Sequence, residues 1–190
     1  MEEKKEIDII RCVLEGDRHS YALLVDTYKA PIFNLAYRMT GSYEDASDLA
    51  QETFVKAFEN LGRFDQGKKF FTWLYTIGLN LVRNHLKKRK KVFLRDFTED
   101  TDLLSRDNPS NPEHSLIREQ RVCHLNMCLH RLSDNLKEAV VLRFYQELSF
   151  EEVAEISGLS LSAAKMRAYR GLEKLRELME EQSGEPDKRL

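Results

Sequence analysis

The sequence predicts an all-α protein made of two small helical domains joined by a flexible linker. Gly and Pro are few, at 8 and 4 of 190 residues, and apolar side chains recur at helical spacings of three and four along most of the chain. Near the middle, a stretch rich in acids, Ser, Asn and Pro has no period, which is typical of a linker. With 42% hydrophobic residues, the chain can support one or two cores.

The first two helices are predicted from their apolar faces and their end signals. Ile7 to Leu14 forms a short amphipathic helix that ends near Gly16. A longer helix runs from Asp17 towards Thr40, where Gly41 closes it. Pro31 lies inside this second pattern and is expected to kink or split the helix.

The next helix carries an acidic stripe. Ser42 offers an N-cap, and the helix should run to about Leu61. Its apolar face is predicted to hold Ala46, Ala50, Phe54, Ala57, Phe58 and Leu61. The other face carries Glu44, Asp45, Asp48 and Glu52, and each like-charge pair at i,i+4 costs an isolated helix about 0.2–0.5 kcal/mol. The stripe is either a solvated helix face or a surface for a basic partner.

Aromatic side chains beside a run of cations mark the helix that follows. After a polar loop around Phe64 and Gly67, a helix is expected from Phe70 to about Lys90. Four of its first six residues are aromatic, and the run Arg83 to Lys91 contains no acid. Rings can stack unpaired bases and cations can follow phosphates, so this stretch predicts binding of single-stranded nucleic acid. The alternative is an ordinary helix with part of the aromatic set in the core and a solvated basic end.

Composition also sets the domain boundaries. The first domain is predicted over residues 1–95, a flexible acidic linker over 96–115, the second domain over 116–182 and a disordered tail over 183–190. In the second domain, helices are expected over Leu116 to Leu132 and from Asp134 onwards. In the free chain, the acidic linker is expected to fold against basic surfaces and weaken binding to bare DNA.

A helix-turn-helix pattern closes the chain. Ser149 begins a capping box with Glu152, Gly158 sits in a tight turn, and Ser160 caps the last helix. Leu161, Ala164, Ala168, Leu172, Leu175 and Met179 form its predicted buried stripe. Its exposed side carries Ser162, Ala163, Lys165, Met166, Arg167, Tyr169, Arg170 and Lys174. The early cations would face guanine edges in a major groove, and the later ones would face phosphates. A helical bundle with a chance turn is the alternative.

The remaining composition argues against several protein classes. A net charge of −2 alone would not suggest a DNA-binding protein, but acids and bases are segregated along the chain. Cys12, Cys123 and Cys128 do not form a disulfide framework or a metal motif. No P-loop, HExxH or nucleophile elbow is present, so we expect no enzyme, cofactor, metal or small-molecule substrate. Without an apolar signal region or membrane-length segment, the protein is expected to be cytoplasmic.

Three motifs together resemble the extracytoplasmic-function (ECF, RpoE-like) RNA polymerase sigma factors of the sigma-70 family. They are Asp45-Ala46-x-Asp48-Leu49-x-Gln51-Glu52-x-Phe54, then Phe71-Thr72-Trp73-Leu74-Tyr75-x-Ile77-x-x-Asn80, then the helix-turn-helix of Ser149 to Arg170. The likeness runs from about Asp17 to Leu178. It implies a region 2 helical bundle, a region 4 helix-turn-helix, and a protein that binds core RNA polymerase and directs promoter-specific initiation. A stand-alone helix-turn-helix regulator remains the alternative.

The resemblance implies roles for three sets of residues. Docking on the polymerase β′ clamp helices falls to Asp45, Asp48, Leu49, Gln51, Glu52 and Phe54. Recognition and melting of the −10 element falls to Phe64, Lys68, Lys69, Trp73, Tyr75, Asn80, Arg83, Asn84 and Lys87, with the Phe64 to Lys69 loop accepting a flipped base. The exposed side of the last helix would read the −35 element. Contact with the polymerase β flap and with an anti-sigma factor is also implied. Ala163 and Met166 depart from the usual recognition helix, which leaves the promoter sequence open.

Overall fold

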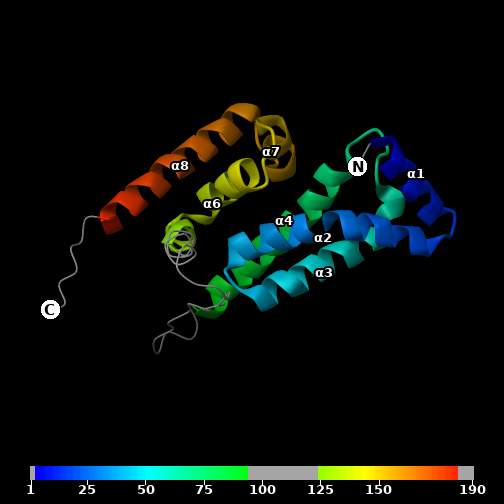
Figure 1. Ribbon diagram of the computed structural model, residues 1–190, viewed down its shortest axis with the longest axis horizontal. Helices are drawn as coiled ribbons and strands as arrows, with labels where there is room; N and C mark the ends of the chain where they lie inside the picture. Colours follow the sequence, from blue (N-terminus) through cyan, green and yellow to red (C-terminus); the bar gives the residue numbers. More distant parts are fainter. Residues whose placement is uncertain (1–2, 94–123, 184–190) are drawn as a thin grey trace, which may run out of the picture.

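The computed structural model describes residues 3–93 and 124–183, and within these ranges every regular element is helical. Two helical groups lie side by side, α1 to α4 in one and α6 to α8 in the other (Figure 1). This arrangement confirms the predicted fold class. The predicted linker at 96–115, Cys123 and most of the predicted tail at 183–190 lie outside the described residues.

The first group contains four α-helices and two short 3₁₀ turns. In chain order these are α1 (Glu3–Leu14), a turn at Arg18–Ser20, α2 (Tyr21–Thr40), α3 (Tyr43–Glu59), a turn at Leu61–Arg63, and α4 (Phe70–Phe93). Of the two outcomes expected at Pro31, a kink or a split, the split does not occur, because α2 runs through Pro31 as one helix. α2 also begins later than predicted, since the Asp17 carboxylate accepts bonds from His19 N and Ser20 Oγ and closes a separate turn there.

The ends of α2 and α3 follow the predicted local rules. Gly41 has φ of 74°, a left-handed conformation that costs glycine little, and it ends α2. Ser42 Oγ accepts a hydrogen bond from Asp45 N at 3.2 Å and begins α3. A turn of two residues, Gly41 and Ser42, therefore connects α2 to α3 and lets the two helices pack against each other.

The core of the first group lies between α1, α2, α3 and α4. Leu24, Leu35 and Leu74 are almost fully buried there. One residue of the predicted apolar face of α3 does not belong to it, because Phe58 is 37% exposed. Phe58 lies at the edge of the core, where its ring centre is 5.0 Å from that of Tyr21 and part of the ring remains exposed to solvent.

The second group begins with a helical segment over 124–131. It continues with α6 (Asp134–Val140), a π-helical turn at Val141–Tyr145, α7 (Phe150–Ser157) and α8 (Leu161–Ser183). The predicted buried stripe of α8 is wrong at Leu161 and Leu172, which are 39% and 42% exposed. Gly171 and Leu178 are buried instead. At Gly171 an added Cβ would lie 2.5 Å from Val140 Cγ2 and 3.0 Å from Leu136 O, so α6 approaches the backbone of α8.

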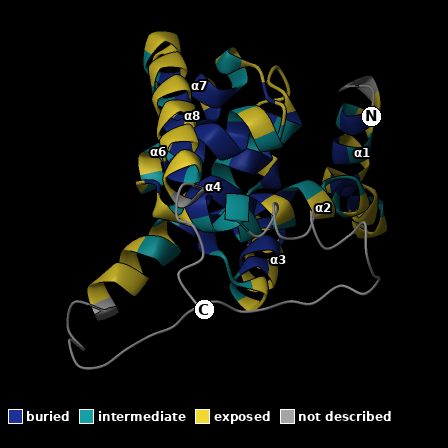
Figure 2. Ribbon diagram, turned by 60° about the vertical axis from the view of Figure 1, so that its left-hand side comes forward, coloured by how far each residue is buried: buried dark blue, intermediate teal, exposed yellow. Residues whose placement is uncertain are grey.

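The two groups are packed against each other through α4. Buried residues continue from α4 into α6 and α7 (Figure 2) and belong to one apolar cluster. Tyr75 of α4 is 2% exposed, and its hydroxyl donates to Gln146 Oε1 at 2.8 Å. Among the described residues, no helix is both long enough and apolar enough to cross a membrane.

Candidate nucleic-acid interfaces

The aromatic start of α4 is mostly core. Phe64 is 8% exposed and meets Phe70 edge-on at 5.6 Å, so its ring has no open face for a base. Tyr75 is also buried, and burial raises the pKa of its phenol. Trp73 is half-buried, and the centre of its ring lies 5.2 Å from that of Phe64 and 5.7 Å from that of Phe70. Of the three aromatic residues in the predicted −10 set, only Trp73 is partly exposed, and Phe64 packs against its ring.

A groove of about 350 Å³ opens beside Trp73. Asn80 and Asn84, one turn apart on α4, line it together with Trp73, and all three belong to the set predicted to contact the −10 strand. Three further polar residues were missed: Lys56 and Asn60 from the end of α3, and Arg63 from the turn after it. Ile77 and Leu81 complete the lining. The groove therefore combines a ring, three amides and two cations, which is the chemistry that holds an unpaired base and its phosphates.

The missed residues left only a weak signal in the sequence. Lys56 and Asn60 are four residues apart and so share a face of α3. Asn60 also caps that helix end, since its Nδ2 donates to Lys56 O at 2.8 Å. Their position beside Trp73, however, depends on how α3 packs against α4. Only the packed structure supplies that relation.

Three predicted strand-binding residues make contacts with the second group. Arg83 donates from Nε and Nη2 to the two carboxylate oxygens of Glu138, at 2.8 and 2.7 Å. Lys69 Nζ donates to Glu152 Oε1 at 3.1 Å, and Tyr75 bonds to Gln146. Lys69 stays exposed in spite of its contact, as do Lys68 and Lys87. The predicted −10 set is thus divided between the groove, the solvent and the contact with α6 and α7.

The acidic stripe of α3 is partly paired and partly open. Asp45 Oδ2 lies 3.3 Å from His85 Nε2 and 3.8 Å from Arg89 Nη1, and Glu52 lies 2.9 Å from Lys56 Nζ. Asp48 is exposed and has no ion pair within the part of the chain that the structure describes. Asp45 therefore does not fit the alternative in which the whole stripe is a solvated helix face.

The docking set also contains two core residues. Leu49 and Phe54 are 6% and 8% exposed, because they lie on the face of α3 that packs inward. They support the helix and present no surface to a partner. The open side of α3 instead carries Asp48 and Gln51, followed one turn later by Val55, which is 49% exposed. Val55 was not predicted as part of this surface, although its spacing from Asp48 and Gln51 could have shown it.

The helix-turn-helix is built as predicted. Ser149 Oγ accepts from Glu152 N at 3.1 Å, while Glu152 Oε2 accepts from Ser149 N at 2.9 Å. Gly158 has φ of 70° in the turn, and Ser160 Oγ accepts from Ala163 N at 3.3 Å. These bonds satisfy amide groups at the starts of α7 and α8 and so fix where both helices begin.

All predicted −35 residues lie on the accessible side of α8. Ala163 and Arg167 are half-buried, and the rest are exposed: Ser162, Lys165, Met166, Tyr169, Arg170 and Lys174. The Tyr169 ring rests on Phe150 of α7 at 5.6 Å, which holds it against the preceding helix. Further along, Lys174 Nζ lies 2.7 Å from Glu177. The outer side of α8 is exposed along its length (Figure 2), as a groove-reading helix requires.

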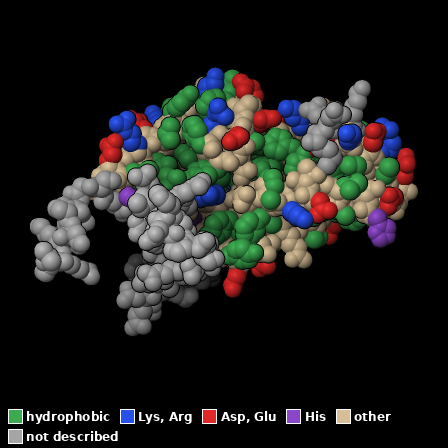
Figure 3. Space-filling view, viewed as in Figure 1, with side chains coloured by type: hydrophobic (Ala, Val, Ile, Leu, Met, Phe, Trp, Pro, Cys, Tyr) green, Lys and Arg blue, Asp and Glu red, His purple; other side chains and the backbone are tan. Residues whose placement is uncertain are grey.

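Charge and metal chemistry add two observations. On the face drawn in Figure 3, cationic and anionic side chains are interspersed and do not gather into one large basic surface. No cluster of three His, Cys, Asp or Glu side chains suited to a metal ion occurs in the ranges 3–93 and 124–183. Burial raises the pKa of the Cys128 thiol, which keeps it protonated and unreactive at neutral pH.

The chain is similar to known proteins over nearly its whole length. Residues 24–92 match the family model described as Sigma-70 region 2, and residues 128–177 match Sigma-70, region 4. The chain is 34% identical over 173 residues to the ECF RNA polymerase sigma factor SigW of Bacillus subtilis, covering 88% of this chain and 92% of that protein. It is 38% identical over 167 residues to the RNA polymerase sigma factor CarQ of Myxococcus xanthus, covering 88% and 93%.

Solved structures agree with this fold. CnrH in complex with the cytosolic domain of CnrY matches with a TM-score of 0.67 and 24% identity, covering 91% of this chain and 96% of that one. The sigma factor RpoE of Bartonella quintana, crystallised with the anti-sigma factor NepR, matches with a TM-score of 0.67 and 23% identity, covering 84% and 96%. At these identities the likeness speaks for the fold alone.

Proposed function

This chain belongs to the extracytoplasmic-function sigma factors of the sigma-70 family, and from that premise we propose how its surfaces divide the work of promoter recognition. It is an alternative sigma factor that directs core RNA polymerase to particular promoters. The stand-alone regulator is set aside, because residues 24–92, which span α3, α4 and most of α2, match Sigma-70 region 2, and a stand-alone helix-turn-helix regulator leaves these helices without a role.

We assign reading of the −10 strand to the groove beside Trp73, and this groove is the observation that carries the proposal. Flipping a base out of the stack costs a few kcal/mol, which stacking and pocket contacts must offset. Trp73 supplies the ring, and Asn80 and Asn84 supply amide groups for base edges. Lys56 and Arg63 supply cations for the neighbouring phosphates. Lys87 extends this cationic track along α4.

We assign the −35 element to α8 in a major groove. Lys165 and Arg167, in the first two turns, would contact base edges, and Arg170 and Lys174 would contact phosphates. Met166 is 48% exposed and offers an apolar contact, for example to a thymine methyl group. The two domains together would then read two separate elements of one promoter.

We assign docking on the polymerase β′ clamp helices to the open side of α3. Asp48 supplies an exposed charge there, with no ion pair among the described residues, while Gln51 and Val55 add polar and apolar contacts. Such a mixture fits a partner that presents basic and apolar side chains. The second domain would contact the β flap. The fold neighbours that were crystallised with CnrY and with the anti-sigma factor NepR support an anti-sigma factor as a further partner.

The proposed activity needs no chemistry from this chain. Binding and strand separation are the whole of its task, so we propose that it has no catalytic activity and that the polymerase forms the RNA bonds. We also place its work in the cytoplasm, where bacterial polymerase and DNA are found.

Transcription from fragmented DNA of the source organism tests this function. Purified core RNA polymerase is incubated with the fragments, with and without this protein, and the new RNA 5′ ends are sequenced. We expect starts that depend on the protein and share two upstream elements. If the protein binds the polymerase yet yields no such starts, or does not bind it at all, the proposed function is wrong.

A further inference from the structure

Two side chains of α8 rest on a single aromatic ring of the preceding helix. Phe150 is the first residue of α7, and its ring centre lies 5.6 Å from that of Tyr169, with the two ring planes at 43°. Lys165 Nζ lies 5.8 Å from the same ring centre. Lys165 and Tyr169 are one turn apart on α8 and so share the flank of the helix that faces α7. One residue of α7 therefore contacts two of the predicted −35 residues.

Each of these contacts favours one orientation of the side chain on α8. Aromatic pairs attract when their ring centres are about 4.5–7 Å apart, and a cation is attracted to a ring within about 6 Å of its centre. Both contacts of Phe150 lie inside these ranges. Tyr169 is nevertheless 57% exposed, and Lys165 is exposed as well. The ring thus orients both side chains and leaves them open to DNA.

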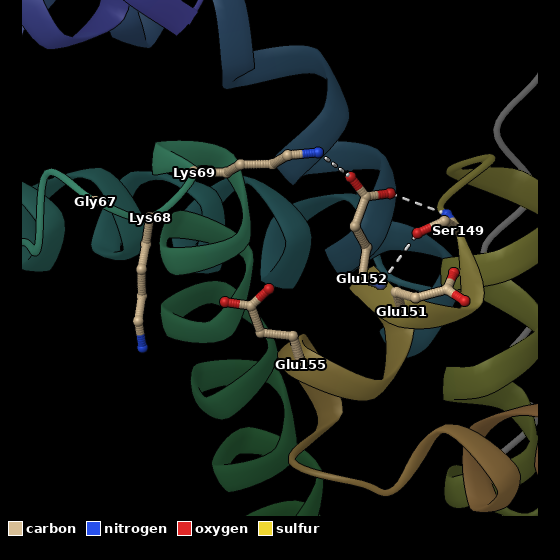
Figure 4. A pocket seen from close by; sticks show the side chains of 7 residues that line it. All are labelled: Gly67, Lys68, Lys69, Ser149, Glu151, Glu152 and Glu155. Atoms are coloured by element: carbon tan, nitrogen blue, oxygen red, sulfur yellow. Dashed lines mark hydrogen bonds and ion pairs between the residues drawn. The ribbon is translucent and has the colours of Figure 1, made fainter.

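The Phe150 ring is itself held in place by its neighbours. Arg143 Cζ lies 4.9 Å from the ring centre, and Arg143 Nη1 donates to Leu148 O at 2.8 Å, just before α7 begins. Ser149 and Glu152, which lie on either side of Phe150 in the sequence, are joined by the two reciprocal bonds drawn in Figure 4. These bonds fix the backbone that carries the ring, so the ring can act as a rigid support.

Other outward residues of α8 lack such a support. Met166 and Arg170 each follow one of the supported residues in the sequence. Neither makes a hydrogen bond, ion pair or ring contact within the part of the chain that the structure describes. These two side chains are therefore free to adjust on DNA, whereas Lys165 and Tyr169 are oriented before DNA arrives.

Orientation decides whether such side chains can distinguish one base pair from another. In a major groove, the ammonium of Lys recognises the O6 and N7 atoms of guanine, and an apolar surface recognises the thymine methyl group. Both contacts need a fixed position, whereas a mobile cation is attracted to any phosphate. A side chain that is already ordered also loses less conformational entropy on binding. A ring that supports Lys165 and Tyr169 therefore favours specific recognition over general affinity for DNA.

We propose that Phe150 is a positioning residue for recognition of the −35 element. Its ring holds Lys165 and Tyr169 in the orientation in which they meet base edges, and Phe150 itself need not touch DNA. The sequence placed every predicted −35 residue on α8, so this role adds a contribution from α7. The inference rests on the proposed function, because it takes α8 to be the reader of the −35 element.

The variant Phe150→Leu tests this role in the full-length chain, assembled with core RNA polymerase for DNA binding. It keeps an apolar side chain at the start of α7 and removes the ring. Phe150→Tyr is the rescue variant, because it restores a ring at the same position. Phe144→Leu is the matched control: Phe144 is 40% exposed, its ring centre lies 5.9 Å from Arg143 Cζ, and within the described residues it has no ring contact with α8. Circular dichroism checks that all variants remain folded.

The first measurement tests the contact itself and needs no DNA. An aromatic ring shifts the resonances of protons that lie close to it, so the ¹H–¹³C spectrum of the lysine-labelled chain reports whether the Lys165 side chain lies on Phe150. The signal is assigned by its absence in Lys165→Arg. We expect a ring-shifted Lys165 signal in the wild type, in Phe150→Tyr and in Phe144→Leu, and its return to an ordinary lysine position in Phe150→Leu.

The second measurement is the affinity of each polymerase complex for a promoter fragment found by start mapping, with the −35 base pairs replaced one at a time. We expect Phe150→Leu to bind the unchanged fragment about 3- to 10-fold more weakly. It should lose discrimination at the same base pairs as Lys165→Met or Tyr169→Leu, and at no others. The salt dependence of its affinity should match that of the wild type, because no phosphate contact is removed. Phe150→Tyr and Phe144→Leu should bind like the wild type.

Each contradicting result has its own signature. If the Lys165 signal is the same in the wild type and in Phe150→Leu, the contact does not form and the inference is wrong. If Phe150→Leu keeps full discrimination, or loses affinity equally for every fragment, the ring does not position the readers and the inference is wrong. If the wild type binds the promoter but Lys165→Met and Tyr169→Leu lose no discrimination, the assignment of these readers on α8 fails first, and the inference fails with it.

Discussion

Arg83 of α4 and Glu138 of α6 lie 55 positions apart in the sequence and form one partly buried ion pair, with two N···O distances of 2.8 and 2.7 Å. An ion pair of this kind needs both partners, since removing one leaves a buried charge without compensation. Arg83 is also a candidate for contact with the −10 strand. The surface that would bind the strand is therefore chemically matched to the chain's own second domain.

Phe54 should matter for stability rather than for docking alone. It is 8% exposed in the core of the first group, although its motif suggested a polymerase contact. We expect Phe54→Ala to lower the free energy of unfolding by about 3–5 kcal/mol, the usual cost of removing a buried aromatic ring. Urea unfolding followed by circular dichroism measures this. The exposed neighbour Gln51→Ala should stay within about 0.5 kcal/mol of the wild type. Equal stabilities for the two variants would place Phe54 on the surface.

Gly171 should tolerate no larger residue, because α6 approaches α8 there. An added Cβ would lie 2.5 Å from Val140 Cγ2 and 3.0 Å from Leu136 O. We expect Gly171→Ala to lower the free energy of unfolding by about 1–3 kcal/mol through overpacking. The sign is informative, since Ala in an open helix interior is better than Gly by about 0.5–1 kcal/mol. A stabilised variant would contradict the close approach. Glu173→Ala, on the exposed side of the same helix, serves as the control.

Glu152 should make stability depend on acid pH. Burial raises the pKa of its carboxyl group. The hydrogen bond from Ser149 N and the ion pair with Lys69 together lower this pKa by more than burial raises it, so the pKa lies below its ordinary value of 4.5. A group with a lowered pKa in the folded state adds stability above its unfolded pKa, and the gain is lost as pH falls through the folded pKa. Glu152→Gln should therefore cost stability at pH 7 and cost progressively less below about pH 4.5.

Urea midpoints measured from pH 3 to pH 7 give this dependence. The adjacent Glu151→Gln is the control, because Glu151 is exposed and has no ion pair within the described residues. Its difference from the wild type should stay small and nearly constant with pH. A stability difference for Glu152→Gln that is the same at pH 3 and pH 7 would show that its charge does not stabilise the fold.

The local features of this fold could be predicted from the sequence because they depend on residues a few positions apart. Gly41 ends one helix, Ser42 begins the next, and the reciprocal box of Ser149 and Glu152 begins α7, all as expected. The helix-turn-helix and its exposed reading side followed from the same rules. These signals act within about one helical turn, so the sequence contains them completely.

The relations between helices could not be predicted in the same way. Phe64 and Trp73 look alike as exposed aromatic candidates, yet packing buries the first and leaves the second half-open. The apolar pattern of α8 favoured large residues, whereas Gly171 provides the actual contact with α6. The sequence also suggested that the acidic linker covers the basic surface, and that remains a prediction because residues 96–115 lie outside the described ranges. Within those ranges, the acidic side chains that pair with cations of α4 and of the loop before it come from α3, α6 and α7.

The division of labour between α3 and α8 is the central claim, and the affinity of core RNA polymerase for two variants tests it most directly. Asp48→Arg reverses a charge on the open side of α3, and Arg167→Ala shortens a side chain on the reading side of α8. We predict that Asp48→Arg weakens polymerase binding and that Arg167→Ala leaves it unchanged, while Arg167→Ala weakens recognition of the −35 duplex by about 1–3 kcal/mol. Equal loss of polymerase affinity in both variants would contradict the account.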